Sequence, residues 1–193
     1  MSEQQYRDLL QTFINKGYKG QFDIRVIGNP PNTGFENALT IEGVYKQHDA
    51  PLNGTLTEKA RIRCINKRIE DTSRLISQRN QAGINDYMSK IIIPKIINYR
   101  PAGRDITDID HPFREIEMKL SSSSYMGFTK IVVIVFCDGH DDANKSSNLK
   151  IKSSVPFDLI LVGWPADKKV HEGVELRLGS ADELINWFKN TKL

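Results

Sequence analysis

The sequence predicts a single α/β (α+β) domain in which helices flank a mixed central β-sheet. The 193 residues, 39% hydrophobic and 26% charged, have the composition of one globular domain with its own core. Residues 1–100 are dominated by helical periodicity, whereas residues 101–193 are rich in strand signals. Because no composition shift or linker separates the two halves, we expect one domain over residues 1–193.

The first half begins with short elements. Residues 3–16 predict an amphipathic helix that ends at Gly17. Residues 22–27 and 39–46 predict strands, because the loop between them is rich in Gly, Pro and Asn. Residues 50–54 predict a further turn before the longest element of this half.

A long helix is expected from Thr57, which is a good N-cap residue, with a basic stretch over residues 58–79. Gly83 is expected to interrupt it, and residues 84–93 resume as helix until Pro94 ends or kinks them. One apolar stripe recurs at three- and four-residue steps and is expected to be buried: Ile62, Ile65, Ile69, Thr72 and Ile76.

The charge of this helix is unusual for the chain. Residues 58–79 hold seven bases and three acids, a local +4, while the rest of the chain sums to −1. Arg63, Lys67 and Arg74 fall roughly opposite the apolar stripe. A local basic face attracts phosphates, so we expect these three residues to bind nucleic acid. A solvated face with intrahelical ion pairs is the alternative.

The second half predicts mainly strands. The apolar run at residues 131–136 is typical of a central strand covered on both faces. Ser180 and Glu183 form a capping-box pattern for a last helix that reaches Asn190. The predicted strands cover residues 106–110, 113–120, 129–137, 157–163 and 174–178.

The candidate catalytic and metal-binding residues are concentrated in residues 105–119. Strand alternation over residues 113–120 would place Glu115, Glu117 and Lys119 on one face, opposite Ile116, Met118 and Leu120. A two-residue turn at His111-Pro112 would place Asp108 opposite Glu115 on the same charged face. Such an oxygen-rich cluster suits Mg²⁺.

This arrangement resembles the PD-(D/E)xK nuclease superfamily, which includes the restriction endonucleases. The matching residues are Asp108, Glu117 and Lys119. The resemblance implies a restriction-endonuclease-like fold in which Asp108 and Glu117 bind Mg²⁺ and Lys119 positions the attacking water. It also implies cleavage of double-stranded DNA by a homodimer. Thr107 stands where the family has proline, and Asp105 or Asp110 could be the ligand in place of Asp108.

Several function classes are disfavoured. The sequence has no membrane-length apolar run and no signal peptide, and its two cysteines are too few for a secreted disulfide framework, so we expect a cytoplasmic protein that does not enter membranes.

Two alternatives to a magnesium-dependent endonuclease remain. One is a non-catalytic nucleic-acid-binding or regulatory protein, and the other is a protein-interaction module in which residues 115–119 are an ordinary solvated strand face.

Overall fold

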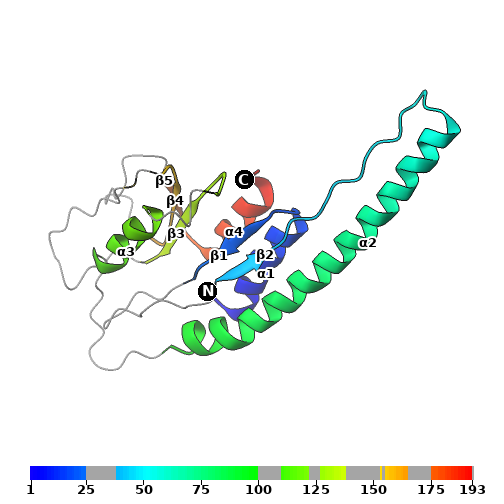
Figure 1. Ribbon diagram of the computed structural model, residues 1–193. Helices are drawn as coiled ribbons and strands as arrows, with labels where there is room; N and C mark the ends of the chain where they lie inside the picture. The colour runs from blue at the N-terminus through cyan, green and yellow to red at the C-terminus, as the bar shows by residue number, and fades with distance from the viewer. Residues whose placement is uncertain are drawn as a thin grey trace.

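The computed structural model has a mixed α/β architecture. It contains four α-helices, an antiparallel pair of strands and a three-stranded parallel sheet within the residues that it describes (Figure 1). The described residues are 1–24, 38–99, 110–121, 127–137, 153, 155–164 and 175–192. The predicted strand at residues 106–110 lies almost wholly outside them, and its last residue begins a helix.

The parallel sheet consists of β3 (Val132–Phe136), β4 (Asp158–Val162) and β5 (Glu175–Leu178), so three predicted strands are confirmed. In the described sheet β4 lies between the other two, with Ile134 opposite Ile160 and Ile160 opposite Leu176. The prediction that residues 131–136 form the central strand is therefore wrong for these residues. The fully buried run belongs to β4 instead.

Helices cover both faces of this sheet. Leu159 and Leu161 pack with Phe113 and Leu120 of α3 (Asp110–Leu120) on one face. Ile160 and Val162 point to the other face, as strand alternation requires, and pack there with residues of α1 (Glu3–Asn15) and α4 (Ala181–Asn190). The result is a three-layer α/β/α arrangement.

The caps of α1 and α4 explain why both helices begin where the sequence predicts. Ser2 and Gln5 form a reciprocal capping box at α1, and Gly17 beyond its C-terminus has φ of 70°, a conformation that glycine adopts without strain. At α4 the Ser180 hydroxyl accepts a hydrogen bond from the Glu183 N–H. The Glu183 carboxylate accepts one from the N–H of Gly179, one residue earlier than a capping box requires.

A second core lies on the opposite side of α1. The strands β1 (Gly20–Phe22) and β2 (Leu39–Ile41) pair in an antiparallel sheet. The strand β2 is shorter than the predicted 39–46, and β1 shares only Phe22 with the strand predicted at 22–27, of which residues 25–27 lie outside the described residues. Leu10 of α1 and Ile41 of β2 are fully buried here. They pack with the end of α2 (Leu56–Tyr87) and with the π-helical turns of η1 (Met88–Ile97). The described strands thus form two sheets rather than one mixed sheet.

The helix α2 differs in three details from expectation. It begins after Thr55, not Thr57, because Thr55 and Glu58 form the capping box. It continues through Gly83, since a glycine costs only about 1 kcal/mol in a helix and neighbouring Ile84 and Tyr87 are buried in the core. Pro94 lies inside η1, which ends at Ile97. Within the described ranges, no helix combines the length and apolarity needed to cross a membrane.

Candidate functional site

The predicted catalytic strand is a helix, so this part of the sequence interpretation is wrong. Phe113 and Leu120 are both 3% exposed and lie seven residues apart, with half-buried Ile116 between them, which is the spacing of one helical face. Met118, which a strand would have packed beside Ile116 and Leu120, is 75% exposed. The hairpin register that placed Asp108 opposite Glu115 is lost with the strand.

The helix separates the residues that the nuclease motif needs together. Glu117 and Lys119 are two residues apart, which places them about 200° apart around the axis of α3. The ammonium group of Lys119 forms an ion pair with Asp23, which follows β1. Asp108 and Asp105 lie outside the described residues, and Asp110 is the first residue of α3.

The described residues do not fit a magnesium site. Among them, no group of three or more His, Cys, Asp or Glu side chains is placed to hold a metal ion. Glu115 and Glu117 are the carboxylates of the expected cluster that are described with their side chains, and their two-residue spacing in α3 places them about 200° apart around the axis rather than at one site. We therefore derive no catalytic step from α3.

A second candidate is a projecting structure that we call the arm, residues 42–80. In Figure 1 the arm extends away from both cores: a chain segment runs outward from β2, and α2 returns alongside it. None of the residues from Leu56 to Leu75 is buried, and Ile76 is the first buried residue of α2. About 30 Å of helix therefore stands clear of the cores.

Two asparagines join the helix of the arm to its outward segment. The Asn80 side chain accepts a hydrogen bond from the Glu42 N–H (3.0 Å) and donates one to the Glu42 carbonyl (2.8 Å). Asn66 does the same with His48 (2.9 and 2.8 Å). Asn66 and Asn80 are fourteen helical residues apart, which is a rise of about 21 Å, and six extended residues span about 20 Å. Both asparagine contacts can therefore form when the outward segment runs straight alongside the helix.

The inner face of the arm is only partly covered. Ile76 is buried and Ile62 and Ile69 are half-buried, but Ile65 is 37% exposed and Thr72 is exposed. The predicted apolar stripe is therefore confirmed only in part. The reason is that the stripe meets a single extended segment over most of its length, not a packed layer.

The tip of the arm is closed by hydrogen bonds. The Gly54 N–H donates to the Pro51 carbonyl in the turn, and the Thr55 hydroxyl accepts from the Glu58 N–H. The Glu58 carboxylate in return accepts from the N–H (2.8 Å) and hydroxyl (3.0 Å) of Thr55. These bonds, the backbone one foremost, lower the pKa of Glu58 below its usual value because they favour the charged carboxylate.

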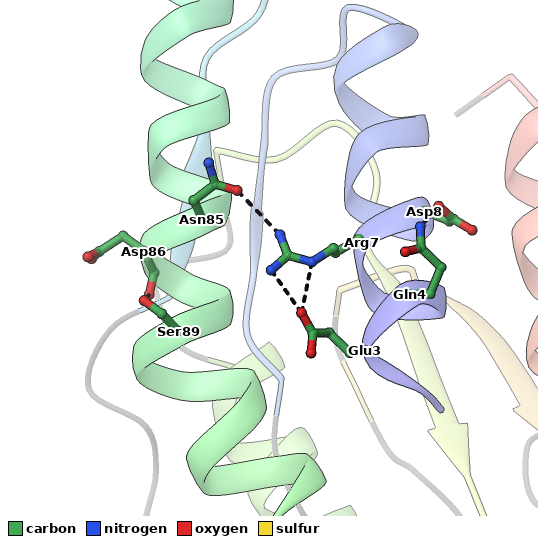
Figure 2. A network of polar contacts seen from close by, with 7 residues as sticks. All are labelled: Glu3, Gln4, Arg7, Asp8, Asn85, Asp86 and Ser89. Atoms are coloured by element: carbon green, nitrogen blue, oxygen red, sulfur yellow. Dashed lines mark hydrogen bonds and ion pairs between the residues drawn. The ribbon is translucent and has the colours of Figure 1, made fainter.

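The part of α2 just beyond the arm contacts α1. Figure 2 shows Arg7 of α1 reaching to Asn85 of α2, with its guanidinium donating to the Asn85 side-chain oxygen (3.3 Å). The same guanidinium is fixed by Glu3, one turn earlier in α1 (2.9 and 3.1 Å). The direction of α2 is thus set by polar contacts as well as by the core.

The arm carries the predicted basic residues on one exposed stripe. Arg63, Lys67 and Arg74 follow i, i+4 and i+11 spacing, which keeps them within about 40° of each other around the axis. Arg74 forms an exposed ion pair with Asp71 (3.3 Å). Within the described residues, Arg63 and Lys67 have no hydrogen bond or ion pair, so their charges face solvent.

Sequence reasoning missed Asp23, Asn66 and Asn80. Nothing in the pattern around Asp23 indicates that it meets a lysine 96 residues away. Asn66 and Asn80 did offer a signal, because they recur two heptads apart with Ser73 midway on the same helical face.

Comparisons with protein-family models, with curated proteins and with solved structures found no match for this chain. The resemblance to PD-(D/E)xK nucleases rests on three residues, of which Glu117 and Lys119 are described and lie in a helix.

Proposed function

We propose that this protein binds double-stranded DNA through the basic arm. The observation that carries the proposal is the alignment of Arg63, Lys67 and Arg74 on one exposed stripe of a helix that stands clear of the cores. Exposed guanidinium and ammonium groups bind phosphate oxygens with little desolvation cost. The arm holds them on a rigid element, which reduces the conformational entropy lost on binding.

The physics of phosphate binding sets the expected behaviour. Each phosphate contact releases condensed counterions, so three contacts contribute about −2.7 to the slope of log K against log salt. Binding of this kind is independent of sequence and typically falls between about 10⁻⁴ and 10⁻⁶ M at physiological salt.

The test is fluorescence anisotropy on a labelled DNA duplex at several salt concentrations. We expect Arg63→Ala/Lys67→Ala/Arg74→Ala to weaken binding and to reduce the slope by about 2 to 3. Lys189→Ala/Lys192→Ala is the control, because both lysines are exposed and lie in or after α4, away from the arm. An unchanged slope in the arm variant would place the DNA surface elsewhere.

The finer expectations remain predictions supported by the sequence resemblance alone: a restriction-endonuclease-like fold, a homodimer and magnesium-dependent cleavage. Plasmid incubated with and without Mg²⁺ tests cleavage. Cleavage that disappears in folded Glu117→Gln and Lys119→Ala variants would support the nuclease and assign a role to α3. DNA binding without cleavage would leave the protein as a non-catalytic DNA-binding protein.

A further inference from the structure

The arm has a second row of basic residues, distinct from the row of Arg63, Lys67 and Arg74. Arg61, Arg68 and Arg79 follow i, i+7 and i+18 spacing and share one stripe, about 130° around the axis from the row of Arg63, Lys67 and Arg74. All three are exposed. Arg79 forms a long ion pair with Glu42 (3.7 Å), while the other two have no hydrogen bond or ion pair within the described residues.

Between the two rows lies the outermost face of the helix, which we call the crest: Ala60, Cys64, Asp71, Leu75 and Gln78. All five residues are exposed, and their stripe is nearly opposite the Asn66 and Asn80 stripe that holds the outward segment. Apart from the half-exposed Leu75, the crest residues are short or unbranched, and the long basic side chains of the two rows extend farther from the axis than any of the five. Asp71 and Gln78 supply the polar groups on the crest.

These dimensions match one DNA feature. A helix with its side chains is about 10–12 Å across, and the major groove of B-form DNA is about 12 Å wide with a phosphate wall on each side. The minor groove, about 6 Å wide, cannot hold a helix. Binding along a single backbone would use one row of bases and leave the other in solvent.

We infer that the arm enters the major groove of B-form DNA with its crest toward the base edges and one basic row against each phosphate wall. The inference rests on the proposed DNA binding and specifies its geometry. A carboxylate such as that of Asp71 can accept from the cytosine amino group, and a glutamine such as Gln78 can pair with adenine. The crest therefore carries groups that can recognise bases, whereas the two basic rows contribute affinity for phosphates that does not depend on sequence.

The first experiment compares a DNA duplex with an RNA duplex of the same sequence and length by anisotropy at one salt concentration. Both carry closely spaced phosphates, but the major groove of A-form RNA is deep and narrow and does not admit side chains. We expect binding to DNA at least about tenfold tighter. Equal affinity would overturn the groove geometry and leave phosphate binding intact, whereas no binding to either duplex would overturn the proposed function itself.

The second experiment blocks the crest. Cys64 is exposed at its centre, so a bulky maleimide should attach there and prevent entry into the groove. We expect the treated protein to bind DNA at least about tenfold more weakly than the untreated one. The Cys64→Ser variant is the matched control, because only Cys137 remains to react and maleimide treatment should leave the DNA affinity of this variant the same as before treatment. Undiminished binding by protein whose labelling at Cys64 is confirmed by mass spectrometry would overturn the inference.

Discussion

The side-chain amide of Asn80 hydrogen-bonds both backbone polar groups of Glu42, in the manner of a residue on a neighbouring strand. Asn80 is only 4% exposed, although it is polar and lies in a helix. Its two bonds satisfy backbone groups at the point where the chain leaves β2 and has no further strand partner among the described residues. This contact fixes the base of the arm.

Replacing Asn80 should therefore be costly. Asn80→Ala leaves a partly buried N–H and a carbonyl of Glu42 without their partner, and we expect a loss of about 2 kcal/mol in the free energy of unfolding. Urea titration measures it. Gln81→Ala, at an exposed position one residue along, should stay within about 0.5 kcal/mol. Equal effects of the two changes would mean that Asn80 does not hold Glu42.

The second asparagine should act locally. Asn66 binds His48 in the exposed part of the arm, so Asn66→Ala should free the outward segment without unfolding either core. We expect faster hydrogen exchange at the His48 amide, with global stability changed by less than about 1 kcal/mol. A fall in global stability as large as that of Asn80→Ala would contradict an arm that opens independently.

The helical assignment of residues 113–120 makes opposite predictions for two neighbouring apolar side chains. Leu120 is buried, so Leu120→Ala should cost about 2–5 kcal/mol in the free energy of unfolding. Met118 is largely exposed, so Met118→Asp should leave the protein folded. A strand would pack both residues alike. Circular dichroism and thermal melts decide between them, and an unfolded Met118→Asp protein would restore the strand.

The ion pair between Lys119 and Asp23 connects α3 to the segment after β1, but it is partly exposed to solvent. Solvent screening limits such a pair, and we expect a coupling of no more than about 1 kcal/mol in a double-mutant cycle with Lys119→Met and Asp23→Asn. A much larger coupling would identify this pair as a main connection between the two cores.

The tip of the arm should respond to acid. The pKa of Glu58 is lowered in the folded protein, so its capping interaction is fully present above the ordinary pKa of 4.5 and is lost as the pH falls through the folded-state pKa. We expect amides in the first turn of α2 to exchange faster below that pH, after correction for intrinsic exchange. Glu58→Gln should remove this pH dependence, and its persistence in the variant would assign the transition to another group.

The helix α3 shows where sequence reasoning failed. Ile116 and Leu120 fit both a strand face with Met118 and a helix face with Phe113, so the apolar pattern alone does not decide. The composition did favour a helix, because Glu, Met, Lys and Leu are good helix formers and Pro112 stands within the first turn. The nuclease-like motif requires a strand at this position, and the structure has a helix.

The sequence predicts the three strands of the parallel sheet correctly but not their order within it. Bounded apolar runs identified β3, β4 and β5 because burial on both faces leaves a continuous hydrophobic signal. The same signal does not identify which strands are neighbours, so the longer apolar run of β3 predicts a central position that β4 occupies instead. The position of β4 depends on pairings between residues far apart in the chain, such as Ile134 with Ile160.

The sequence predicts some features of the arm but not others. Its helix and the basic stripe of Arg63, Lys67 and Arg74 follow from periodicity, and the structure places them as expected. Its projection does not follow, since exposure depends on what lies opposite the apolar stripe. Ile65 and Ile76 look alike in the sequence, yet one is partly exposed and the other is buried.

The two asparagine contacts also restrict the length of the arm to certain discrete values. Seven helical residues advance about 10.5 Å and three extended residues advance about 10 Å, so the two sides stay in step only when they change together in this ratio. Inserting two heptads of α2 between Asn66 and Asn80 together with six residues between Glu42 and His48 would lengthen the arm and keep both contacts, because an even number of extended residues leaves the N–H and C=O of His48 facing α2. Deleting four residues from the helix alone would turn Asn66 out of register with His48. The reach of this protein can thus be altered in steps of about 20 Å, by changes made in both segments at once.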